Sequence, residues 1–292
     1  MRLKTAAGKR MIDLIKEKLK TYSLDTRQDE ENATKEILQE IAIYALWRAK
    51  FFDVALFHGG TSLRILHGLP RFSEDLDFMI AVPNPDFDWA PYLKKLLACF
   101  EEYGLSSEAQ QKGNLDTSIR KAILKDTSVV NQLDLSFAGR HPKEKIKIKL
   151  EIDVNPPAHT GEGGTYLDFP LDHEVRHQDL SSNFALKIHA LLCRGFLKGR
   201  DWYDFSWYVA KGVFPNLPHL QAALIQKGPW QDKADLTVDK EWLKETLRDK
   251  IESLDWDEAK TDVRPFLRPN DSVSLDLWGA SFFNAKLGKL IS

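Results

Sequence analysis

The chain has 292 residues, of which 43% are hydrophobic and 11% aromatic, and its formal net charge is −2. This composition excludes global disorder, and the balanced charge excludes a uniformly basic nucleic-acid binder. Only Cys99 and Cys193 occur, without metal-type spacing, and no apolar run approaches the length of a membrane span. We therefore expect a cytoplasmic protein without membrane contact.

Helices and short strands are predicted in turn along the first hundred residues. Residues 1–22 predict a charged helix, since seven of the first twenty are Lys or Arg. The spacing of apolar residues predicts further helices over 33–50 and 91–103. The apolar runs 51–57 and 76–80 predict buried strands, the first of them ended by two glycines.

The clearest strand is 146–154, where apolar and charged side chains alternate over nine residues. Shorter alternation at 133–137 predicts a hairpin partner for it. After a segment rich in proline and glycine, helical patterning takes over. We therefore predict a mixed α/β half, residues 1–175, followed by a mainly helical half, residues 176–292.

Two closely spaced acids, Asp75 and Asp77, are the first candidates for chemistry. In a strand, side chains two residues apart face the same way, and carboxylates held that close repel unless a cation lies between them. Oxygen-only ligands favour Mg²⁺, with Mn²⁺ as the alternative. An isolated Asp-x-Asp is more often a solvated strand edge. Asp153 is the candidate for a third metal-binding acid and Glu151 is the fallback, because both lie on the polar face of their strand, opposite to its apolar side chains.

The segment Gly59-Gly60-Thr61-Ser62 directly follows a predicted strand. Paired glycines let the backbone approach a ligand closely, and N–H groups with the two hydroxyls can bind phosphate oxygens. A lone Gly-Gly is more often a tight turn, and the glycine spacing here is not that of a P-loop.

Lysines precede the acids on the strand 146–154. Lys147 and Lys149 share the polar side of that strand with Glu151 and Asp153. They could guide a polyanion toward a metal site, although as solvated strand residues they need no function.

The combination of "GGTSLR" with "RFSEDLDF" resembles the AbiEii/AbiGii toxins, within the polymerase-beta-like nucleotidyltransferase superfamily. The likeness extends over about residues 35–270 and includes the segment "KGRDWYDF" at 198–205. It implies an α+β fold: a nucleotidyltransferase-like mixed β-sheet flanked by helices, then a mainly helical C-terminal domain that completes the NTP site.

The resemblance also implies roles for single residues. Asp75, Asp77 and Asp153 would hold the metals and act in catalysis, together with Lys187 and Asp204. The residues that would bind the NTP are Gly59, Gly60, Thr61, Ser62, Arg71, Lys187 and Arg194. Lys187 and Arg194 lie seven apart, so on one helix they would share a face about 10 Å apart and could straddle a triphosphate.

The implied reaction is Mg-dependent transfer of an NMP from an NTP to an acceptor, with tRNA as the leading choice. The implied setting is a toxin–antitoxin pair of the abortive-infection type, with a cognate antitoxin protein as partner. One alternative is transfer to a small molecule such as an antibiotic. Others are a nucleotide-binding interaction module without turnover and a metal-dependent nuclease, which would leave the Gly-Gly-Thr-Ser segment unexplained.

Overall fold

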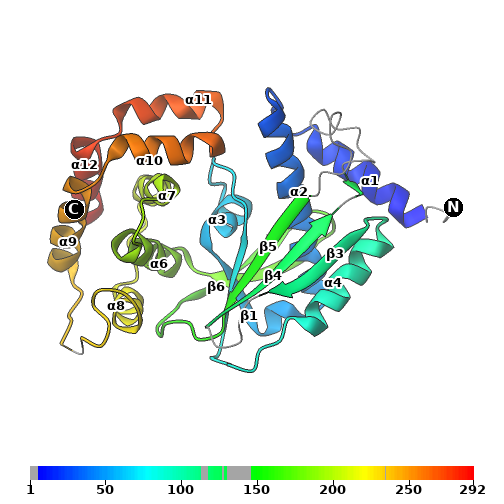
Figure 1. Cartoon of the computed structure of the whole chain (residues 1–292), viewed down its shortest axis with the longest axis horizontal. Coiled ribbons are helices and arrows are strands. Elements are labelled where there is room, and N and C mark those ends of the chain that lie inside the picture. The colour runs from blue at the N-terminus through cyan, green and yellow to red at the C-terminus, as the bar shows by residue number, and fades with distance from the viewer. Residues whose placement is uncertain (1–5, 113–117, 127, 130–145, 234) are drawn as a thin grey trace. The chain divides into compact units, whose positions relative to one another are not determined.

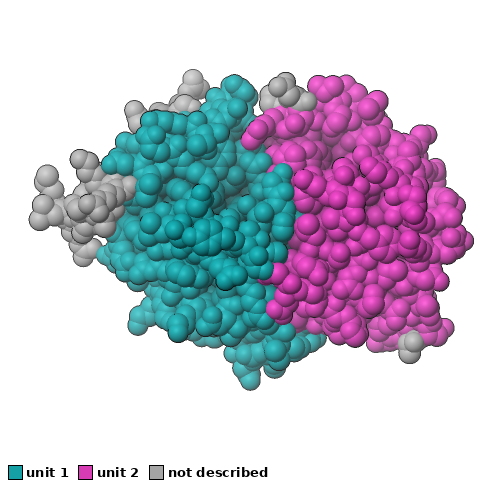
Figure 2. Space-filling view, turned by 180° about the vertical axis from the view of Figure 1, so that it is seen from behind, with its two compact units in different colours: residues 1–68, 72–155, 164–177 teal, residues 69–71, 156–163, 178–292 magenta. Residues whose placement is uncertain are grey.

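The structure is a computed structural model that describes residues 6–112, 118–126, 128–129, 146–233 and 235–292. These residues form two compact units, shown in different colours in Figure 2. Unit 1 comprises Met1–Gly68, Phe72–Asn155 and Gly164–His177. Unit 2 comprises Leu69–Arg71, Pro156–Gly163 and Gln178–Ser292. The main segment of unit 2 thus starts at Gln178. The sequence pattern does not predict that Leu69–Arg71 and Pro156–Gly163 also belong to this unit.

Unit 1 is built on a mixed sheet of seven strands in the order β3-β4-β5-β2-β1-β7-β6 (Figure 1). The strands are β1 (Ala55–His58), β2 (Leu76–Ile80), β3 (Ser107–Lys112), β4 (Ile119–Asp126), β5 (Ile146–Asp153), β6 (Glu162–Leu167) and β7 (His173–Gln178). Strand β2 runs antiparallel to β1 and parallel to β5, and β4 runs antiparallel to both β3 and β5.

The core of unit 1 lies between one face of this sheet and the helices α1 (Ala6–Leu19), α2 (Arg27–Arg48) and α4 (Ala90–Glu102). The alternation of β5 decides which face is buried, because its apolar side chains all join this core. Helix α2 begins with a capping box, in which Thr26 and Asp29 each accept a hydrogen bond from the other's backbone N–H. The opposite face carries the charged side chains of β5, and Leu56 and Met79 are buried on it.

Most of the elements predicted in the first half are present, with shifted ends. The strand 76–80 is confirmed, and the helices predicted over 1–22, 33–50 and 91–103 correspond to α1, α2 and α4. The run 51–57 is only partly a strand: Lys50 has a left-handed backbone with φ 62°, and Phe51–Asp53 form a 3₁₀ turn, η1, before β1. Strand β5 pairs with β2 and β4. The predicted partner at 133–137 lies outside the described residues.

Unit 2 is mainly helical. Its helices are α6 (Leu180–Cys193), α7 (Gly199–Ala210), α8 (Leu217–Gln226), α9 (Lys240–Glu252), α10 (Trp256–Val263), α11 (Pro269–Ser272) and α12 (Ala280–Ile291), with 3₁₀ turns η3 (Arg264–Phe266) and η4 (Val273–Leu277). Four of them begin at an Asp or Asn whose side chain accepts a backbone N–H bond, which satisfies otherwise unpaired donors. Trp202, Phe205 and Phe283 pack together in its interior.

The predicted fold class is confirmed: a mixed sheet flanked by helices, followed by a helical part. Within the described ranges, no helix is both long and apolar enough to cross a membrane.

Candidate active site

The candidate metal-binding acids lie on the polar face of the sheet in unit 1. In the pairing of β2 with β5, Asp77 lies opposite Glu151, whereas Asp153 lies opposite Met79. Residues paired in this way project from the same face, and positions two apart on one strand do so as well. Asp75, Asp77, Glu151 and Asp153 therefore share one face, with Glu151 directly opposite Asp77 and Asp153 two residues further along β5.

Two of these acids form ion pairs with lysines of the same sheet. Lys149 Nζ lies 3.7 Å from Asp75 Oδ1, and Lys121 Nζ lies 3.0 Å from Glu151 Oε1. All four side chains are partly exposed, so these pairs are easily exchanged for other partners. Asp153 Oδ1 accepts a hydrogen bond from Asn155 N at 2.9 Å, a turn contact at the end of β5.

The glycine turn fits directly against Asp77. Helix α3 (Gly59–His67) starts as soon as β1 ends, and Gly59 has φ +77°. A Cβ added at Gly59 would lie 2.7 Å from Asp77 Oδ2, closer than non-bonded atoms allow. Position 59 therefore favours glycine for two reasons, its positive φ and the Asp77 carboxylate beside it.

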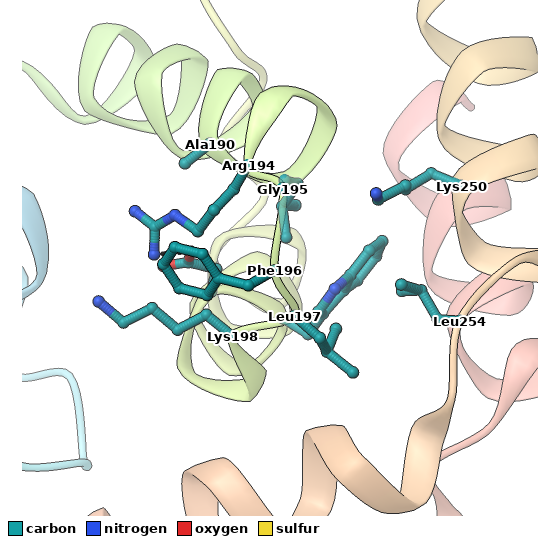
Figure 3. Close-up of a pocket in the computed structure, with 11 residues that line it drawn as sticks. Ala190, Arg194, Gly195, Phe196, Leu197, Lys198, Lys250 and Leu254 are labelled. Carbon is teal, nitrogen blue, oxygen red and sulfur yellow. Dashed lines mark ion pairs between the residues drawn. The ribbon is translucent and has the colours of Figure 1, made fainter.

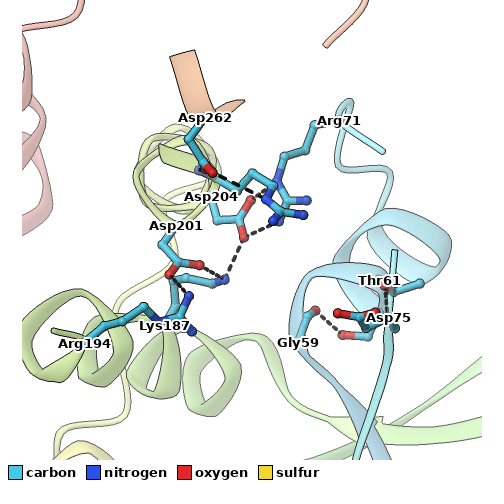
Figure 4. Close-up of polar contacts among 11 residues, drawn as sticks. Gly59, Thr61, Arg71, Asp75, Lys187, Arg194, Asp201, Asp204 and Asp262 are labelled. Atoms are coloured by element: carbon cyan, nitrogen blue, oxygen red, sulfur yellow. Dashed lines mark hydrogen bonds and ion pairs between the residues drawn. The ribbon is translucent and has the colours of Figure 1, made fainter. Parts of the chain in front are cut away.

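The hydroxyls of the turn are used within the protein (Figure 4). Thr61 Oγ1 donates to the backbone carbonyl of Asp75, and Ser62 Oγ donates to that of Gly59 at 2.8 Å. Both side chains are buried. The hydrogen bond of Thr61 holds the start of α3 against the Asp-x-Asp segment. Both hydroxyls therefore make hydrogen bonds within the protein.

We predict that Gly59→Ala lowers activity much more than Gly68→Ala does. Both glycines have positive φ, +77° and +70°, so each alanine should cost about 1–3 kcal/mol of stability from backbone strain. A Cβ at Gly68 meets nothing within 4 Å, whereas one at Gly59 displaces the Asp77 carboxylate. Thermal unfolding and nucleotidyl transfer measured on both variants test this. Equal activity in the two variants would contradict it.

Unit 2 holds a buried network of five charged residues (Figure 4). Arg71 donates two hydrogen bonds of 2.6 Å to the carboxylate of Asp204. Lys187 Nζ lies 2.7 Å from Asp201 Oδ1 and 2.9 Å from Asp204 Oδ2. Arg194 Nη1 lies 3.0 Å from Asp201 Oδ2. Three cations therefore share two carboxylates, leaving one excess positive charge.

Lys187 and Asp201 of this network keep their charges although both are buried. Burial would lower the pKa of Lys187, but Asp201 and Asp204 more than offset it, so that pKa is raised. Burial would likewise raise the pKa of Asp201, yet Lys187 and Arg194 hold it below its usual value. Asp204 thus orients both Lys187 and Arg71.

The interpretation of Lys187 and Arg194 as neighbours on one helix face is wrong. Helix α6 ends at Cys193, and Arg194 caps it with an extended backbone. The carboxylate of Asp201 bridges the two cations. Asp201 and Asp204 lie three residues apart on α7, and both contact Lys187.

A small pocket of about 100 Å³ opens beside this network in unit 2 (Figure 3). Phe196 is 68% exposed and lies under the Arg194 guanidinium, 5.1 Å from ring centre to Cζ. Lys198 lines the same pocket, and its burial lowers its pKa against the opposing effect of Asp201. An exposed aromatic ring beside two cations suits a nucleobase and its phosphates.

The acids of unit 1 fit a metal that is held jointly with phosphates. Among the described residues, no group of three or more His, Cys, Asp or Glu side chains is arranged to hold a metal ion by itself. Mg²⁺ usually takes only one or two carboxylates together with substrate phosphates, and Asp75 and Asp77 offer such a set.

Sequence reasoning about the site missed three features. Asp201 joins Lys187 to Arg194, and the only sequence signal for it is its spacing of three from Asp204. Phe196 and Lys198 had no signal beyond their position after α6. Arg71, expected to contact the NTP, is buried and engaged by Asp204.

Comparison with known proteins gives the chain its family. The family described as "Nucleotidyl transferase AbiEii toxin, Type IV TA system" matches residues 41–282. No curated protein matches the sequence.

Two solved structures are similar to the chain. One is a Helicobacter pylori protein assigned provisionally as a nucleotidyltransferase, with 18% identity, TM-score 0.46, and coverage of 87% of this chain and 93% of that one. The other is JHP933 from Helicobacter pylori, with 18% identity, TM-score 0.46, and coverage of 87% and 90%. The match to the family extends over most of the chain, and the chain therefore belongs to the AbiEii family of nucleotidyltransferase toxins.

Proposed function

We propose that the chain transfers an NMP from an NTP to the 3′ hydroxyl of a tRNA in a Mg²⁺-dependent reaction. The observation that carries this proposal is the juxtaposition in unit 1 of the Gly59 turn, Asp77 and Glu151. The family adds that the enzyme acts as a toxin, which implies an NTP substrate and an antitoxin partner.

Asp75 and Asp77 are the proposed metal ligands, and Glu151 replaces Asp153 as our choice for the third acid. Glu151 is the residue paired with Asp77 across the two strands, while Asp153 lies opposite Met79 and accepts a turn hydrogen bond. The metal, when bound, neutralises phosphate charge and lowers the pKa of the acceptor hydroxyl.

The first turn of α3 is the proposed phosphate-binding element. Backbone N–H groups at the start of a helix have no carbonyl partner within it, and the helix dipole favours an anion there. Gly60 and Thr61 contribute such groups. In the reaction, the acceptor oxygen forms a bond to the α-phosphorus and the bond from that phosphorus to the β-phosphate oxygen breaks. Pyrophosphate leaves, and Glu151 accepts the hydroxyl proton.

The pocket around Phe196 is proposed as a base-binding surface within unit 2. A base would stack on the exposed ring, which Arg194 and Lys198 flank in the same pocket. Lys187 lies deeper and is held by two carboxylates, so we assign it the role of keeping Arg194 and Asp201 in place.

Transfer to a small cationic acceptor is the second candidate. Its acceptor would need an acid-lined surface, whereas Lys149 and Lys121 lie beside the acids Asp75 and Glu151 of the proposed catalytic site. An anionic acceptor is therefore favoured.

The experiment incubates the protein with Mg²⁺, each α-labelled NTP in turn, and total tRNA. Label should move to tRNA with the native chain and be lost with Asp75→Ala/Asp77→Ala. Phe196→Ala should raise the Kd for the preferred NTP about 5- to 100-fold, since stacking contributes about 1–3 kcal/mol per base. NTP binding without label on tRNA would exclude the tRNA proposal and favour a small-molecule acceptor.

A further inference from the structure

The polar face of the sheet continues beyond the acids across β5, β4 and β3. The pairing of these strands aligns Lys121 with both Glu151 and Lys112, and it aligns Lys125 with both Lys147 and Glu108. Paired residues project from the same face. We call this surface the lysine face, and its cations are Lys112, Lys121, Lys125, Lys147 and Lys149.

The lysine face begins at the candidate metal site. Lys149 reaches Asp75 and Lys121 reaches Glu151, so two of its cations contact the acids themselves. The other three lysines lie on the same face of β3, β4 and β5. Adjacent strands are about 4.8 Å apart, and successive residues on one face of a strand are about 7 Å apart. All five belong to unit 1.

Its charge is a local exception in a chain of net charge −2. Three aligned rows on the three strands carry five lysines and two glutamates, with Gln110 and Ile123 as the neutral residues, and the next row on this face, Ile119 with Asp153, adds one acid at the metal-site end. No aromatic side chain occurs at these positions, so the surface offers cations for phosphates but no ring on which a base could stack.

We propose that the lysine face binds the sugar–phosphate backbone of the RNA acceptor and leads its 3′ end to Asp75 and Asp77. This proposal rests on the proposed function. It adds where the RNA binds, and it adds that the RNA is bound without regard to its base sequence. A cationic small molecule would be repelled by the same surface. An acidic protein is the competing occupant, and the experiment below separates it from RNA.

The test measures binding of a 3′-hydroxyl single-stranded RNA, by fluorescence anisotropy, to the full chain in EDTA without NTP. The variant is Lys112→Gln/Lys121→Gln/Lys125→Gln/Lys147→Gln. The matched control removes four exposed lysines of unit 2, in Lys211→Gln/Lys233→Gln/Lys240→Gln/Lys289→Gln. Circular dichroism establishes that both variants are folded, and binding of polyglutamate is measured in parallel.

The lysine-face variant should raise the Kd for RNA about 10- to 100-fold at low salt. It should also reduce the slope of log Kd against log salt by about 2–3, because each phosphate contact on a single strand contributes about 0.7. The control should bind within about twofold of the native chain. Equal losses in the two variants, or an unchanged slope, would overturn the proposal. Polyglutamate that binds more tightly than RNA of equal charge would overturn it in favour of an acidic protein.

The two proposals fail separately. If the native chain labels no tRNA but the lysine-face variant still loses RNA binding, the transferase substrate is wrong and the RNA surface stands. If label reaches tRNA and the variant binds RNA like the native chain, the acceptor proposal stands and the lysine face is not its binding surface.

Discussion

Asp77→Asn is expected to lower nucleotidyl transfer by at least about 10²–10³-fold while leaving the unfolding temperature close to that of the native chain. Asp77 lies on the polar face of β2, opposite Glu151, with its carboxylate against Gly59. The amide keeps the shape but removes the negative charge that a cation needs, and it offers one oxygen instead of two. Because the side chain is partly exposed, little stability depends on its charge.

The neighbouring acids supply matched controls for this prediction. Glu151→Gln should lose activity to a similar extent, whereas Asp153→Asn should lose less than about tenfold, because Asp153 lies opposite Met79. Initial rates with the preferred NTP and tRNA, at saturating Mg²⁺, give the comparison. The reverse order would return the third site to Asp153. Full activity in Asp77→Asn would exclude this face of the sheet as the catalytic site.

The sequence was most informative where one face of an element is buried. Strand β5 could be predicted because Ile146, Ile148, Leu150 and Ile152 alternate with charged residues, and that alternation is what a half-buried strand requires. Strand β3, "SEAQQK", lies at the edge of the sheet and has no such pattern. Its pairing with β4 places it there, which is a tertiary effect that local sequence does not record.

Local sequence likewise predicts only part of the candidate site. Glycine pairs and an Asp-x-Asp segment are local signals, and both were located correctly on the chain. The choice between Glu151 and Asp153 depends on strand register, which is fixed by the packing of the whole sheet. The role of Arg71 depends on Asp204, 133 residues away. No periodicity within a window could have joined these two residues.

Loss of the buried ion pair between Arg71 and Asp204 is expected to have the largest effect on stability. Asp204→Asn should lower the free energy of unfolding by about 3–5 kcal/mol, since it leaves Arg71 and Lys187 buried with one carboxylate fewer. Asp262→Asn is the matched control: Asp262 pairs with Arg200 at 3.9 Å and its side chain is 32% exposed, so its loss should cost about 0–1 kcal/mol.

The pH dependence of stability offers a second measurement on the same network. The pKa of Asp201 is lower in the folded chain than its usual value of 3.8, because Lys187 and Arg194 outweigh the effect of burial. Its contribution is therefore fully present above pH 3.8 and is lost as the pH falls through the folded pKa. Urea unfolding of the native chain should show stability falling in that acid range, and Asp201→Asn should show a weaker fall there together with lower stability at pH 7. If Asp204→Asn were as stable as Asp262→Asn, or if Asp201→Asn kept the full acid dependence, the charges of this network would not stabilise unit 2.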